Sequence, residues 1–242
     1  MRAARRARVI FIALLAVMLG AVIQGSIGFG FALVAVPTFT LLWPEAVPSA
    51  LLLIAVPMTI TMALREHGAI DFSGLFYSTV GRIVGTVAGA ALLAMIQADS
   101  LALVVGTMIV LAVVLSLFGA PTEVEWGTGL AAGFASGVMS TAAAIGGAPM
   151  ALAYQARPGT ELRSTLSASF VLGTLMSLAA LALTGRVDGG HVILALEMIP
   201  AMLAGLFLSR YLNPWLDARW LRPAVLCFAG VAGVLAIAQG LH

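Results

Sequence analysis

Charged residues are scarce in this sequence, and lysine is absent. Only 9% of the 242 residues are Asp, Glu, Lys or Arg, whereas 62% are hydrophobic, and the mean hydropathy is +1.10. A soluble domain of this length needs many more polar residues to cover its surface. The sequence therefore predicts an all-α polytopic membrane protein in contact with the lipid bilayer.

Residues that build metal sites and covalent catalysts are also few. The chain has one cysteine, Cys227, which excludes an internal disulfide and a cysteine metal cluster. It has no His-Glu-x-x-His pattern, and residues 134–137 read Phe-Ala-Ser-Gly rather than the Gly-x-Ser-Gly of an intramembrane protease. The arginines after the N-terminus are scattered singly. We therefore expect no enzyme, no metal, no cofactor and no nucleic-acid partner.

The chain begins with a basic tail. Residues 1–8 contain four arginines, and an apolar run starts at Val9. A signal peptide would begin in the same way, but the hydrophobicity continues as far as Trp43, which favours a retained first segment. The positive-inside rule places this tail in the cytoplasm, as in a protein of the bacterial inner (plasma) membrane.

The apolar segments that follow divide the chain into two similar halves. We predict a first transmembrane repeat over 9–118, a connector over 119–125 and a second repeat over 126–242, with four hydrophobic segments in each repeat. Loop charges leave seven and eight crossings open, and two re-entrant broken segments would make the repeats inverted. Within the first repeat, a four-residue spacing of glycines predicts close helix packing at Gly81, Gly85 and Gly89.

The first segment of each half is interrupted by a Gly-rich and Pro-containing motif. In the first half the motif is residues 25–30, followed by Pro37, and in the second half it is residues 145–149. The separation of Gly25 from Pro37 equals that of Gly137 from Pro149. Lipid cannot satisfy the backbone groups of a broken helix, so such breaks belong in a protein interior or beside a watery cavity. The paired breaks predict one shared binding site near the bilayer midplane.

Polar groups and free backbone near these breaks suit an anion. The predicted substrate-binding residues are Gln24, Gly25, Ser26, Gly28, Gly30, Arg82, Ser140, Thr141, Gly146, Gly147 and Pro149. A charge such as Arg82 within a membrane segment costs about 3 kcal/mol, which favours a functional role, although a snorkelling arginine is the alternative. Glu197 occupies nearly the corresponding position in the second half. It is predicted to pair with Arg82, to carry a coupling proton, or to do both in alternation.

Short motifs in both halves resemble the sulfite exporter TauE/SafE family of membrane permeases. The second half carries Gly146-Gly147-Ala148-Pro149, then Tyr154, and then Arg163-Ser164-Thr165-Leu166, and the first half carries Gly28-Phe29-Gly30 before Pro37. The family typically has Gly-Gly-Pro-Pro where this chain has Ala148 as the third residue, and glycines within 141–144 that are missing here.

The resemblance implies a permease, or secondary transporter, for a small anion. Sulfur-containing anions such as sulfite, sulfoacetate, thiosulfate or an organosulfonate are the expected substrates, with alternating access at the broken-helix site. An anion channel and a non-transporting structural membrane subunit are the alternatives. The sequence leaves the coupling ion, the direction of transport and the oligomeric state open.

Overall fold

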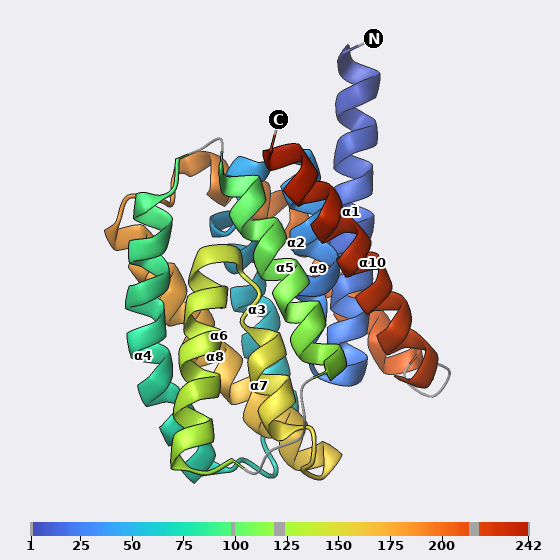
Figure 1. Ribbon diagram of the computed structural model, residues 1–242. Helices are drawn as coiled ribbons and strands as arrows, with labels where there is room; N and C mark the ends of the chain where they lie inside the picture. Colours follow the sequence, from blue (N-terminus) through green and yellow to red (C-terminus); the bar gives the residue numbers. More distant parts are fainter. Residues whose placement is uncertain (1, 98–99, 119–123, 213–217, 242) are drawn as a thin grey trace.

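The computed structural model describes residues 2–97, 100–118, 124–212 and 218–241, and within these ranges the regular elements are helices without any strand. Residues 119–123 of the predicted connector lie outside this part of the chain. Figure 1 shows the helices in chain order: α1 (Arg2–Ile27), α2 (Phe31–Leu42), η1 (Pro44–Ala46), α3 (Ser49–Arg65), α4 (Phe72–Met95), α5 (Leu101–Phe118), α6 (Trp126–Ala143), α7 (Gly147–Tyr154), α8 (Gly159–Leu183), α9 (Gly189–Leu212) and α10 (Ala218–Gly240).

Six of the described helices are long and apolar enough to cross a membrane: α1, α4, α5, α8, α9 and α10. Helices α2 and α3 are apolar but shorter. The predicted all-α membrane class is therefore confirmed. Helix α1 begins at Arg2, so the backbone of residues 2–8 in the predicted basic tail is the first part of this helix, which extends beyond its neighbours in Figure 1.

Each predicted break is the tip of a helical hairpin. Helix α1 turns back into α2, so that Gly20 on α1 faces Phe31 at the start of α2. Helix α6 turns back into α7, which runs toward the end of the molecule where α6 begins (Figure 1). Both broken segments therefore reverse the chain direction.

Helices of the first half pack mainly on helices of the second half, and the same pairs result when corresponding helices of the two halves are swapped. Helix α4 packs along α6 just as α9 packs along α1, while α3 packs on α8 and α5 on α10. Gly81 and Gly85 of α4 face Leu130 and Phe134 of α6 in the same order, so these two helices are parallel. Helices α1 and α9 are parallel by the same test, whereas α6 runs opposite to α1 in Figure 1. This is the inverted arrangement, and homology between the halves stays a prediction.

Glycines allow α4 and α6 to approach within backbone contact. A Cβ atom added to Gly85 would lie 2.1 Å from the carbonyl oxygen of Phe134, and one on Gly89 would lie 2.8 Å from that of Val138. The predicted close packing of the glycine face is confirmed. Because α4 belongs to the first half and α6 to the second, the halves interlock rather than form separate bodies.

Candidate functional site

Both breaks line one cavity of about 60 Å³. The first break contributes Phe29 and Gly30, the second contributes Ala144 to Gly147, and α3, α4 and α8 complete the wall. A cavity of this volume has room for water or a small ion. The prediction that the two breaks share a cavity is confirmed, and its depth in the bilayer stays a prediction.

The two breaks turn the chain by different means. In the first, Gly28 and Gly30 have φ values of 97° and 121°, which residues with a Cβ atom rarely adopt. In the second, Ala144 takes the left-handed conformation, with φ 60° and ψ 24°. The helix break predicted within 145–149 is found at 144–146, so it begins one residue earlier than predicted. Pro149 does not form the turn: it lies in the first turn of α7, where a missing N–H is tolerated.

The paired glycines of the second break leave room for neighbouring side chains. A Cβ atom on Gly146 would lie 2.8 Å from Nη2 of Arg82, and the hydroxyl of Ser136 donates a hydrogen bond to the Gly146 carbonyl. A Cβ atom on Gly147 would make an ordinary 3.6 Å contact with Phe170. Gly146 is therefore required for the close approach of an arginine to the break.

Arg82 on α4 is a buried cation in the cavity wall. Its side chain is 3% exposed, and Nη1 donates to the carbonyl oxygen of Ser169 at 2.8 Å and to the Ser169 hydroxyl at 3.0 Å. Its Nε atom is buried without a partner, and no ion pair joins Arg82 to a carboxylate within the described ranges. The snorkelling alternative is therefore wrong, because the guanidinium is held inside the protein.

Glu197 lies elsewhere. It is exposed on α9 and lines a separate crevice, together with Arg6, Glu45 and His191, on the side of the molecule where α1 begins. The structure does not bring Glu197 to Arg82, so the predicted ion pair is wrong. Equivalent positions in two inverted halves need not face one another. Its role as a proton carrier stays a prediction.

Neutral polar side chains complete the cavity wall. Gln24 spans the first break, because its Oε1 atom accepts a hydrogen bond of 3.1 Å from the backbone N–H of Phe31 at the start of α2. Ser140 lines the cavity and accepts a 3.1 Å hydrogen bond from the hydroxyl of Ser177. Thr141 lies behind it, 2.9 Å from Ser177, and does not reach the cavity.

The comparison with family models decides which family this is. The model described as sulfite exporter TauE/SafE matches residues 12–236, nearly the whole chain. The chain belongs to the sulfite exporter TauE/SafE family. Searches among curated proteins and among solved structures gave no match. Membership makes the protein a membrane permease of the sulfite exporter kind, in a family of transporters rather than enzymes.

Three motif residues of the second half, Tyr154, Arg163 and Thr165, contact the loop between α3 and α4. Tyr154 donates a hydrogen bond of 3.3 Å to the Asp71 carboxylate, and the backbone N–H of Asp71 donates to the Thr165 hydroxyl at 2.9 Å. Arg163 forms an ion pair of 3.2 Å with Glu66 in the same loop. These motif residues fasten the loop and lie outside the cavity wall.

Four other predicted residues of the TauE/SafE chain do not line the cavity: Gly25, Ser26, Gly28 and Pro149. Gly25 packs on Ser209 of α9, and Gly28 contacts the side chain of Arg163. Sequence reasoning missed four residues of α8. Ser169 and Gly173 contact Arg82, and Phe170 and Thr174 line the cavity wall. Only the packing of α8 against α4 reveals which face of α8 is turned toward the site.

Proposed function

We propose that the protein carries a small, sulfur-containing oxyanion across the membrane by alternating access at the cavity between the two breaks. Sulfite, thiosulfate, sulfoacetate and other organosulfonates are the candidate substrates. One observation carries the proposal: Arg82, a buried arginine that has no acidic partner among the described residues, lines the cavity formed by both breaks.

The hydrogen-bonding pattern of Arg82 favours an oxyanion as the species that it binds. Ser169 occupies Nη1, while Nε has no partner and Nη2 points toward Gly146 at the break. A buried charge without a counter-charge is costly, and an anion beside it offsets that cost. The planar fork of a guanidinium matches two oxygens of one oxyanion better than it matches a monatomic ion.

Weak additional donors suit a site that must release its substrate. The hydroxyls of Ser140 and Thr174 and the side-chain amide of Gln24 line the same wall without adding charge. Helix α2 also begins at the cavity, and the N-terminus of a helix carries about half a positive charge. One fixed cation with neutral donors binds an anion less tightly than several cations would, which permits its release.

The inverted packing supports alternating access rather than a fixed pore. In transporters with inverted repeats, the halves exchange conformations around a site formed by discontinuous helices. Here α1–α2 and α6–α7 supply the two discontinuous helices, and both meet the cavity. An exchange of conformation between them would open the cavity to one side and close it to the other.

Flux measurements on protein reconstituted in liposomes test the function. We expect saturable uptake of one or more of sulfite, thiosulfate and sulfonates, and acceleration of uptake by the same anion preloaded inside, as for a carrier. Flux that rises linearly with concentration would favour the anion channel. Absence of flux for all of these anions, in correctly inserted protein, would favour a structural subunit and overturn the proposal.

A further inference from the structure

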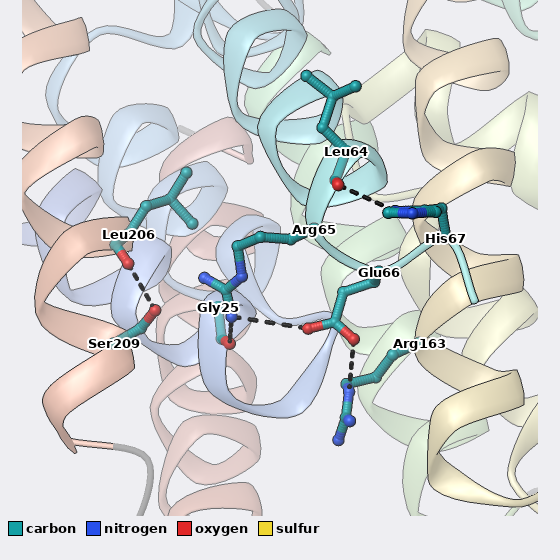
Figure 2. Close-up of polar contacts among 8 residues, drawn as sticks. All are labelled: Gly25, Leu64, Arg65, Glu66, His67, Arg163, Leu206 and Ser209. Atoms are coloured by element: carbon teal, nitrogen blue, oxygen red, sulfur yellow. Dashed lines mark hydrogen bonds and ion pairs between the residues drawn. The ribbon is translucent and has the colours of Figure 1, made fainter. Parts of the chain in front are cut away.

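Arg65, Glu66 and Arg163 form a charged cluster at the C-terminal end of α1, away from the two termini (Figures 1 and 2). Glu66 follows α3 and lies between two arginines, 3.6 Å from Nη2 of Arg65 and 3.2 Å from Nε of Arg163. The side chains are partly exposed, at 22% for Arg65, 19% for Glu66 and 36% for Arg163. One carboxylate faces two guanidinium groups, so the cluster has a net positive charge.

This cluster touches the first break. Nη2 of Arg65 donates a 3.4 Å hydrogen bond to the carbonyl oxygen of Gly25 in the last turn of α1, as Figure 2 shows. Cγ of Arg163 lies 3.1 Å from the position of a Cβ atom on Gly28. Gly30, two residues beyond Gly28, lines the cavity. The same short segment is therefore held by the cluster on one side and forms the cavity wall on the other.

One face of α8 leads from the cluster toward the cavity. Residues separated by four, three and four positions share a face of a helix, and on α8 this series is Arg163, Ser167, Phe170 and Thr174. Phe170 and Thr174 line the cavity, and Ser167 lies between them and Arg163 along the helix. The hydroxyl of Ser167 is buried without a hydrogen-bond partner, as is that of Ser26 beside Gly25. The Ser167 hydroxyl therefore has hydrogen-bonding capacity left for an anion near this face.

We propose that Arg65 and Arg163 form a second oxyanion site at the mouth of the cavity, which Glu66 fills when no anion is present. A carboxylate and a sulfur oxyanion offer a guanidinium the same kind of acceptor. An incoming anion exchanges with the Glu66 carboxylate, and this exchange breaks the Arg163–Glu66 ion pair, which is one of the contacts between the α3–α4 loop and α8. The inference rests on the proposed permease function, whose transport site it extends.

Arginine footprinting tests this site without relying on transport. Phenylglyoxal modifies accessible arginines, and peptide mass spectrometry measures the rate at each one. We expect sulfate or thiosulfate to slow modification of Arg65 and Arg163, beyond the effect of chloride at equal ionic strength. In Glu66→Gln the carboxylate competitor is absent, so half-protection is expected at about fivefold lower anion concentration.

Glu161→Gln is the matched control, because Glu161 pairs with Arg157 at 3.5 Å on the same helix end and contacts neither break. It should leave the protection of Arg163 unchanged. Equal half-protection concentrations in wild type and Glu66→Gln, or protection of Arg157 as strong as that of Arg163, would overturn the proposal. If protection occurs as expected but the wild type transports no anion, the anion site stands and its role at a transport mouth falls. If the wild type transports and no protection is seen, the second site alone is rejected.

Discussion

The guanidinium of Arg82 lies directly against Gly173 of α8: a Cβ atom added to Gly173 would be 2.0 Å from Cζ of Arg82. Ser169, one helical turn earlier, supplies the hydrogen-bond acceptors for Nη1. One stretch of α8 therefore provides both the space for the cation and the bonds that fix its orientation. The position of the charge in the cavity depends on how α8 packs against α4.

Gly173→Ala should displace Arg82 and weaken anion binding about tenfold, because the added methyl group occupies the place of the guanidinium. Titration of the purified variant with the transported anion measures the effect. Gly230→Ala is the control, since its added Cβ would be 3.8 Å from the side chain of Val113, an ordinary contact. An unchanged Kd in folded Gly173→Ala would show that the glycine does not position Arg82.

The paired glycines of the second break should tolerate different substitutions. Gly146→Ala is expected to abolish most transport, because its methyl group meets Cβ of Ser140 at 2.7 Å and both Nη2 of Arg82 and the backbone oxygen of Ser136 at 2.8 Å. Gly147→Ala should retain transport, since the nearest atom is 3.6 Å away. Gly147→Leu should again abolish transport by filling the cavity. Initial flux in liposomes with matched protein insertion provides the comparison. Equal activities of the two alanine variants would contradict this account of the break.

The glycines between α4 and α6 should contribute to the stability of the folded protein rather than to anion binding. Gly85→Ala places a methyl group 2.1 Å from the Phe134 carbonyl oxygen and should destabilise the protein by about 1–3 kcal/mol. Thermal unfolding in detergent measures the loss. Gly127→Ala on α6, which meets no atom within 4 Å, should leave the unfolding temperature unchanged or raise it. A Gly85→Ala variant as stable as the wild type would mean that the two helices separate at little cost.

Glu197→Gln should separate proton coupling from anion binding. Glu197 lies in the separate crevice that Arg6 and His191 also line, and not in the cavity wall, so its neutralisation should leave the Kd of the anion within about twofold of the wild type. If Glu197 is the coupling carboxylate, the same variant has a flatter pH dependence of flux. A normal pH profile in Glu197→Gln would remove Glu197 from the coupling scheme.

The membrane class, the two breaks and the position of Arg82 beside the breaks could be predicted from the sequence. Long apolar runs, paired glycine motifs and a charge inside an apolar segment are local signals, and each has one strong physical interpretation. The left-handed turn at Ala144 could not be predicted, because alanine has no preference for that conformation. The contacts of Ser169 and Gly173 depend on which face of α8 packs against α4, and periodicity alone does not select it.

The orientation in the membrane is a further case in which local signals are insufficient. Four of the twelve arginines lie in residues 1–8, and the other eight are spread over later segments and loops of both halves. The positive-inside rule needs a clear difference between the sides. An inverted arrangement places equivalent loops on opposite sides and reduces that difference. The cytoplasmic N-terminus therefore stays a prediction.

The proposed function depends on anion binding by Arg82, so neutralisation of Arg82 is its most direct test. Kd values for the transported anion are measured by titration of purified wild type and Arg82→Gln, with circular dichroism and thermal unfolding as checks of folding. Loss of a charged hydrogen-bonding partner should weaken binding by about ten- to a hundredfold without eliminating it, because Ser140, Thr174 and Gln24 remain in the cavity wall. A Kd in Arg82→Gln equal to that of the wild type would contradict the assignment of this cavity as the anion site.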